Sequence, residues 1–197
     1  MNLPNKLTML RIFMIPLFIA AFYLPEKWVL CTVNSQPIQL KFIIAGIIFL
    51  LAYITDTLDG VIARKRNLIT DFGKLMDPTA DKLLTAAAMI MLCRFPVMSI
   101  GNGLMPIFTV IVIAREMFVS GIRQLAGSKG IVIAAKPIGK AKTTLQFAAL
   151  LTVMLFGQIL RAINLPIDFI AVLAAVLLTI WSGIDYTLGA KELFKNR

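Results

Sequence analysis

Residues 56–64 read Asp-Thr-Leu-Asp-Gly-Val-Ile-Ala-Arg, and Gly73, Asp77 and Asp81 follow them. Written as a pattern, this stretch is D-x2-D-G-x2-A-R-x8-G-x3-D-x3-D. Its carboxylates lie within or beside segments that are apolar enough to be membrane helices. A charged side chain at the centre of a bilayer costs at least ~2.5–3.5 kcal/mol, so aspartates in such segments are candidates for a functional site.

The composition around this stretch is that of a membrane protein. Hydrophobic residues make up 59% of the 197 residues and charged residues 15%, and the apolar residues occur in long runs. A helix that spans a bilayer needs about 20 mostly apolar residues. The sequence therefore predicts an all-α integral membrane protein, a single domain over residues 1–197. Six transmembrane helices are expected, at residues 7–24, 40–63, 79–95, 104–125, 143–163 and 167–188.

Basic residues are unevenly distributed between the two ends of these predicted spans. One end carries Arg64, Lys65, Arg66, Lys74, Lys129, Lys136, Lys140, Lys142, Lys191, Lys195 and Arg197, and the other carries Lys27, Lys41, Arg94 and Arg161. By the positive-inside rule, both termini and the aspartates are expected on the cytoplasmic side of the cell membrane. The net charge of +10 is then explained by cytoplasmic loops, anionic lipids and phosphorylated substrates, and no nucleic-acid partner is expected.

The chain contains no histidine, so a catalytic base must be a carboxylate and a metal site must be built from oxygen ligands. Hard cations such as Mg²⁺ and Mn²⁺ suit such ligands. Cys31 and Cys93 are not spaced as a metal or redox motif. We expect two ordinary thiols, with a disulfide between them as the alternative.

The residues of the pattern share narrow faces of two predicted helices. At about 100° per residue, each set covers a stripe roughly 100° wide or less. The first set is Asp56, Asp59, Gly60 and Ala63, and the second is Gly73, Asp77 and Asp81. If the stripes face each other, four carboxylates meet, and their repulsion favours binding of divalent cations, two of them in our interpretation.

Simpler explanations exist for several of these residues. Gly60 and Ala63 are small residues at helical spacing, which equally serves close helix packing. Arg64 could pair with a phosphate or be part of a charged stop after a membrane span. Asp71 is best explained as a helix cap.

The eight fixed positions of the pattern resemble the signature of the CDP-alcohol phosphatidyltransferase family. These membrane enzymes join a CDP-activated alcohol to a second alcohol. The resemblance implies that Asp56, Asp59, Asp77 and Asp81 hold the metal ions, with Asp81 also the general base. It implies contacts to the CDP-linked donor from Gly60, Ala63, Arg64 and Gly73, and from Asn5, Thr8 and Arg11 near the N-terminus; Asn5 and Thr8 could instead cap the first helix.

A second stretch bears on the acceptor alcohol. Residues 115–123 (Arg-Glu-Met-Phe-Val-Ser-Gly-Ile-Arg) and 134–143 (Ala-Ala-Lys-Pro-Ile-Gly-Lys-Ala-Lys-Thr) resemble the phosphatidylglycerophosphate-forming branch of the family. Arg115 and Arg123 are about two helical turns apart and share a face, and with Lys140 they could hold the phosphate of glycerol 3-phosphate. Arg115 could instead pair with Glu116 or an aspartate of the cluster, and Lys142 is expected to be general cytoplasmic charge.

The expected reaction transfers a phosphatidyl group from CDP-diacylglycerol to sn-glycerol 3-phosphate, with release of CMP. The alternatives are a relative that uses inositol phosphate, serine or phosphatidylglycerol as acceptor and, more distantly, a divalent-cation transporter. Transporter sites lie near the midplane of the membrane, whereas these carboxylates cluster towards one face. The family resemblance also implies a homodimer.

Overall fold

The structure is a computed structural model that describes residues 3–66, 71–95, 97–128 and 137–189. Residues 3–8, 57–66 and 71–78 are described for the backbone only. The described chain is mostly helical. Its long helices are α1 (Leu3–Ala21), α2 (Leu40–Arg66), α3 (Asp71–Arg94), α4 (Met105–Ser128), α5 (Pro137–Ala162) and α6 (Ile167–Gly189). A short 3-10 turn, η1 (Asn102–Leu104), precedes α4.

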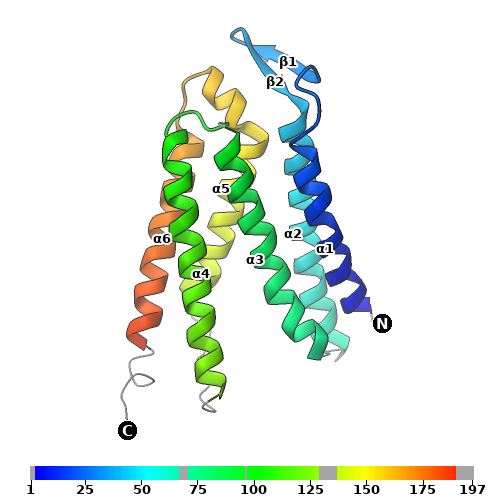
Figure 1. The fold of residues 1–197 in the computed structure, drawn as a ribbon, viewed down its shortest axis with the longest axis vertical. Helices are drawn as coiled ribbons and strands as arrows, with labels where there is room; N and C mark the ends of the chain where they lie inside the picture. The colour runs from blue at the N-terminus through cyan, green and yellow to red at the C-terminus, as the bar shows by residue number, and fades with distance from the viewer. Residues whose placement is uncertain (1–2, 67–70, 96, 129–136, 190–197) are drawn as a thin grey trace.

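The long helices run alternately up and down along one bundle (Figure 1). Helix α1 packs on α2 and α3, and α6 packs on α4 and α5. Contacts of α3 with α4 and of α2 with α5 join these two groups. The start of α1, the end of α2 and the start of α3 lie at the same end of the bundle, and so do the end of α4 and the start of α5 (Figure 1). The basic segments of the sequence flank these helix ends, as the charge distribution predicts.

The core of the bundle is apolar and partly aromatic. Phe18 packs edge-on against Phe22, with ring centroids 5.2 Å apart, and also lies against Phe49. These rings pack with buried Met89 and Met154 of α3 and α5 in one continuous cluster. Large apolar side chains also cover the outside of the helices, as expected for a surface that faces lipid.

Within the described residues, three helices are long and apolar enough to cross a membrane: Asn102–Ser128, Pro137–Ala162 and Ile167–Gly189. Met9–Ala21 is a shorter apolar helix. Each of the six predicted spans coincides with a helix of the bundle. The third helix begins at Asp71, before the predicted start of the span at residue 79, so Pro78 lies inside it.

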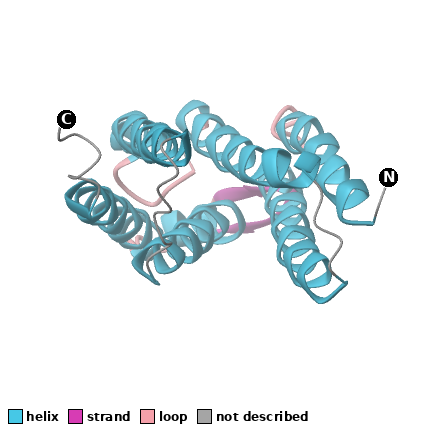
Figure 2. Cartoon of the chain, turned by 90° about the horizontal axis from the view of Figure 1, so that it is seen from below, coloured by secondary structure: helices cyan, strands magenta, loops and turns pink. Residues whose placement is uncertain are grey.

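The bundle is all-helical as predicted, but the structure adds a β-hairpin that was not predicted. Strands β1 (Val29–Val33) and β2 (Gln36–Gln39) pair antiparallel between α1 and α2, at the end opposite the start of α1 (Figures 1 and 2). Asn34 and Ser35 form the two-residue turn with φ of 47° and 64°. Two consecutive positive φ angles are those of a type I′ turn, which matches the twist of the strands. β-Branched residues beside Asn34 were the available sequence signal.

The two cysteines are free, as expected: Cys31 is exposed on β1 and Cys93 lies near the end of α3. The Cys93 sulfur lies 3.1 Å from the Thr109 hydroxyl.

Candidate active site

A cavity of about 720 Å³ opens among α1 to α5. Its charged lining residues come from five helices. They are Arg11, Asp56, Asp81, Lys82, Glu116, Arg123 and Lys142. Asp56 and Asp81 come from α2 and α3, whereas Glu116, Arg123 and Lys142 come from α4 and α5. One cavity therefore brings carboxylates from the pattern near cationic residues more than 40 positions further along the chain.

Arg11 connects α1 to the carboxylates of this cavity. Its Nη1 lies 2.6 Å from Oδ1 of Asp56, and its side chain is only 1% exposed. Asp81 lies on the neighbouring helix, near enough to Asp56 and Arg11 to interact with both charges. A buried guanidinium needs a counter-charge. Asp56 of α2, the first residue of the aspartate pattern, provides it. The sequence placed these three residues at one site, and the structure brings them together.

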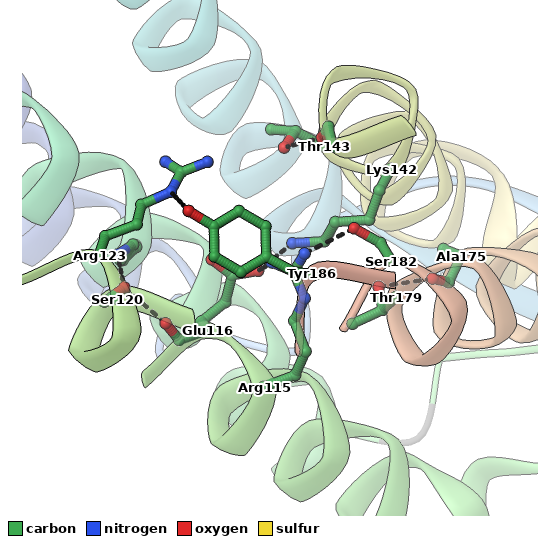
Figure 3. Close-up of polar contacts among 12 residues, drawn as sticks. Arg115, Glu116, Ser120, Arg123, Lys142, Thr143, Ala175, Thr179, Ser182 and Tyr186 are labelled. Carbon is green, nitrogen blue, oxygen red and sulfur yellow. Dashed lines mark hydrogen bonds and ion pairs between the residues drawn. The ribbon is translucent and has the colours of Figure 1, made fainter. Parts of the chain in front are cut away.

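Glu116, which lines the same cavity, holds two cationic side chains (Figure 3). Its Oε1 accepts a hydrogen bond of 2.9 Å from Nη1 of Arg115 and forms an ion pair with Lys142. Nη2 of Arg115 donates to the Ser182 hydroxyl of α6 at 2.6 Å. The carboxylate thus joins α4 to α5, and Arg115 joins α4 to α6.

Hydrogen bonds also fix the neighbouring polar residues of α4. Ser120 donates from its hydroxyl to the carbonyl of Glu116 at 2.6 Å and accepts a hydrogen bond from Lys82 of α3. Arg123 donates from Nε to the Tyr186 hydroxyl at 3.0 Å, and Figure 3 shows its two Nη atoms pointing away from that tyrosine. Hydrogen bonds with Lys82 of α3 and Tyr186 of α6 therefore orient these residues of α4 at the cavity.

An aromatic wall lines the deeper part of the cavity. The ring of Tyr53 stacks on that of Phe147, with centroids 3.6 Å apart, and Phe147 also stacks on Phe49 at 5.0 Å. All three rings line the cavity. The space therefore has charged groups beside an apolar wall, a combination that fits an amphipathic ligand with a phosphorylated part and an aliphatic part.

Comparison with known proteins decides the family. The model of the CDP-alcohol phosphatidyltransferase family matches residues 1–181. The chain belongs to the CDP-alcohol phosphatidyltransferase family. A Bacillus subtilis member named CDP-diacylglycerol–glycerol-3-phosphate 3-phosphatidyltransferase is 39% identical over 186 residues, which cover 94% of this chain and 93% of the relative. Relatives with the same name from Rickettsia bellii and Sodalis glossinidius are 37% and 34% identical and are covered over 97% and 99% of their lengths.

Only part of the family signature lies within the described side chains. Asp56 and Asp81 line the cavity. For eight other residues predicted to bind the metal or the donor, the structure describes the backbone only. They are Asp59, Gly60, Ala63 and Arg64 in α2, Gly73 and Asp77 in α3, and Asn5 and Thr8 in α1. Among the described residues, no group of three carboxylate, thiol or imidazole ligands occurs. The four-aspartate metal site stays a prediction.

The predicted acceptor residues do not all meet at the cavity. Arg123 lines it, and its contact with the acceptor phosphate stays a prediction. Arg115 instead lines a separate apolar groove between α4 and α6 and pairs with Glu116, which was the alternative expectation. Lys140 is exposed and is not among the described lining residues, whereas Lys142, expected to be general loop charge, is buried and lines the cavity.

Glu116, Lys82 and Lys142 are the cavity residues that sequence reasoning missed. Glu116 is a carboxylate inside an apolar helix, and the criterion that singled out the aspartates applies to it equally. The sequence has no comparable signal for Lys142, which follows a basic loop; in the structure it is buried and paired with Glu116 of α4.

Proposed function

We propose that this chain transfers a phosphatidyl group from CDP-diacylglycerol to sn-glycerol 3-phosphate, forming phosphatidylglycerophosphate and CMP in phospholipid biosynthesis. The observation that carries the proposal is one cavity lined by the carboxylates of Asp56 and Asp81, the cationic side chains of Arg123 and Lys142, and an aromatic wall. The chain's membership of the family and the shared name of the relatives that it matches over nearly full length support the same reaction.

In the proposed reaction, Asp81 is the general base. Its carboxylate accepts the proton of the free primary hydroxyl of glycerol 3-phosphate while that oxygen attacks the lipid-side phosphorus of CDP-diacylglycerol. The new P–O bond forms as the bond to the CMP oxygen breaks, and CMP leaves with the electron pair. A positioned general base typically contributes ~10²–10⁴-fold to the rate.

The carboxylates of the cavity fit a divalent-cation site. Asp56 and Asp81 come from two helices and share one cavity, and carboxylate oxygens are the donors that Mg²⁺ and Mn²⁺ prefer. With Asp59 and Asp77 of the same helices they would hold Mg²⁺ or Mn²⁺, two ions in this proposal. Bound there, such ions supply positive charge that stabilises the phosphoryl oxygens and the departing CMP. Arg11 holds Asp56 in place, and Gly60, Ala63, Arg64, Gly73, Asn5 and Thr8 would contact the CDP part of the donor.

The acceptor phosphate is proposed to bind at Arg123 and Lys142. Both line the same cavity as the aspartates, and Arg123 is already oriented by Tyr186. Glu116 holds Lys142 in position through their ion pair, and Arg115 pairs with the same carboxylate; in this proposal neither Glu116 nor Arg115 contacts the phosphate. Lys140, exposed and outside the described lining, is not part of this site in the revised proposal.

We propose six transmembrane spans in one domain over residues 1–197, with both termini and the cavity facing the cytoplasm. The described helix ends that adjoin the basic segments in the sequence lie together at one end of the bundle, which supports this topology. A homodimer is proposed from the family resemblance alone.

The proposal is tested by incubating purified protein with CDP-diacylglycerol, Mg²⁺ and one candidate acceptor at a time, and measuring CMP release. We expect release with glycerol 3-phosphate and far less with serine, inositol phosphate or phosphatidylglycerol. CMP release that depends on one of the other acceptors would assign the chain to another branch of the family. Cation transport into vesicles without any CMP release would overturn the enzyme class.

A further inference from the structure

The β-hairpin exposes an unusually apolar surface. Leu30 is 62% exposed, Tyr23 is 69% exposed just before it, and Trp28 and Val29 are also exposed. Leu30 is the extra residue of a β-bulge, because Val29 pairs with Gln39 and Cys31 pairs with Ile38. A bulge turns a side chain away from its ladder, here outward from the bundle.

The hairpin is nevertheless rigidly attached to the bundle. Gln158 of α5 accepts a hydrogen bond from the Gln39 backbone N–H at 2.8 Å and donates to its carbonyl at 3.3 Å. Asn34 at the turn donates to the carbonyl of Ala162 at 3.0 Å, and Ile38 of β2 is buried. Strand β2 therefore faces the helices, and β1 is the outer strand. The apolar side chains of β1 are held in place and are not those of a loose loop.

Two physical limits bracket the environment of β1. In water, an outer strand with exposed Trp28, Val29 and Leu30 would be a site for aggregation. In the hydrocarbon core, the backbone groups on its outer edge would lack partners, because β1 pairs only with β2 in the described structure, and each unpaired group costs several kcal/mol. The headgroup region of a bilayer satisfies both limits, since it supplies water and polar partners beside apolar chains.

The residues around the strand have the chemistry of that region. Phe13 and Leu17 are also exposed on α1, the helix that precedes Tyr23 and the hairpin in the chain. Tyr and Trp are enriched at membrane–water interfaces, where their amphipathic rings sit at the level of the headgroups. Glu26, between Tyr23 and Trp28 in the sequence, adds charge through its 3.0 Å pair with Lys41.

We infer that the hairpin is an interfacial anchor that lies in the headgroup layer of the bilayer, at the end of the bundle remote from the candidate active site. Its partner is the phospholipid surface, contacted by Tyr23, Trp28, Val29 and Leu30. This inference rests on the membrane location of the bundle and not on the proposed reaction.

The anchor also sets the depth of the active site. The Leu40 N–H donates to the Trp28 carbonyl at 2.8 Å, so Trp28 lies level with the start of α2. Asp56 is sixteen residues further along α2, which at ~1.5 Å per residue is about 24 Å. Because the hydrocarbon core is about 30 Å thick, Asp56 then lies a few ångströms inside its opposite boundary. Soluble acceptor can reach that level from one side only.

Tryptophan fluorescence tests the inference, because the chain has two tryptophans, Trp28 and Trp181. The Trp181→Phe variant is reconstituted into phosphatidylcholine vesicles with bromines either near the headgroup end or near the methyl end of the acyl chains. We expect the shallow bromines to quench Trp28 at least twofold more strongly than the deep ones. The matched Trp28→Phe variant reports Trp181, which is exposed on α6 about 21 Å from its start and should show the reverse order.

Three results would each overturn the inference. The first is stronger quenching of Trp28 by deep than by shallow bromines. The second is quenching of Trp28 by aqueous iodide but by neither brominated lipid. The third is protection of Trp28 from iodide and from both brominated lipids, which would mean that protein covers the hairpin. A spin label on exposed Cys31, with Cys93→Ser, provides a reading that does not depend on the tryptophan variants. At the interface its accessibilities to oxygen and to a water-soluble nickel chelate should be comparable. Dominance of either would contradict the anchor.

Discussion

Two lysines of α5, Lys140 and Lys142, distinguish the acceptor site proposed from the structure from the acceptor site predicted from the sequence alone. Lys142 is 4% exposed, lines the cavity and pairs with Glu116, whereas Lys140 is exposed. Changing each lysine to methionine removes its charge and keeps an unbranched side chain of similar length. If Lys142 contacts the acceptor phosphate, Lys142→Met should raise the KM for glycerol 3-phosphate, and Lys140→Met should leave it nearly unchanged.

The size of the effect follows from the contacts. Loss of a hydrogen bond to a charged group costs ~1.5–3 kcal/mol, which corresponds to a roughly ten- to hundredfold rise in KM. Fold disruption is a smaller concern at this position than at most buried charges. Glu116 keeps its 2.9 Å contact with Arg115 when Lys142 is replaced, so no carboxylate is left without a counter-charge.

The assay measures CMP release at varied glycerol 3-phosphate and saturating CDP-diacylglycerol, and then at varied CDP-diacylglycerol and saturating acceptor. The donor KM should change less than threefold in both variants, which separates a lost phosphate contact from a general loss of structure. An acceptor KM that rises with Lys140→Met and not with Lys142→Met would refute the revised site and restore the one predicted from sequence. Equal rises in both KM values for Lys142→Met would mean that the lysine is structural.

Three further outcomes are expected. Asp81→Asn should lower kcat at least a hundredfold, because it removes the general base but keeps the shape of the side chain. Binding of CDP-diacylglycerol with Mg²⁺ should survive better in this variant than in Asp56→Asn. Equal loss of donor binding in both variants would make Asp81 chiefly a metal ligand. Arg11→Met should lower the free energy of unfolding by about 1.5–3 kcal/mol through loss of the contact with Asp56, and an unchanged detergent melting temperature would contradict the buried pair. Cysteines placed at Lys65 and Lys140 should be protected from an impermeant reagent in intact cells, and labelling of both from outside would reverse the proposed topology.

Much of this fold could be predicted because long apolar helices can be recognised from local sequence. About 20 consecutive apolar residues and the one-sided distribution of basic residues are properties of the chain itself. The same holds for Asp56 and Asp81, whose charge inside apolar segments singles them out. The sequence could also group Arg11 with them through the family resemblance, and the structure places all three at one cavity.

The rest depends on contacts between distant segments. Arg115 lies in the middle of α4 and Lys142 near the start of α5; Glu116 binds both, yet only Lys142 lines the cavity. Whether Lys140 or Lys142 faces the cavity depends on how α5 is rotated within the bundle. No local feature of the sequence indicates that rotation. The hairpin is different, because a local signal was present. Asn34 and the nearby β-branched residues are typical of a hairpin turn, but the segment was interpreted only as the connection between two predicted spans.

The most direct test of the proposed reaction is the mass of the lipid formed in competition. Purified protein, CDP-diacylglycerol and Mg²⁺ are incubated with equal concentrations of glycerol 3-phosphate, serine, inositol phosphate and phosphatidylglycerol, and the lipid products are identified by mass spectrometry. We predict that phosphatidylglycerophosphate predominates, in amounts equal to the CMP released, and that Asp81→Asn abolishes both. A different phosphatidyl lipid as the main product, or full activity in Asp81→Asn, would contradict the proposed chemistry of this cavity.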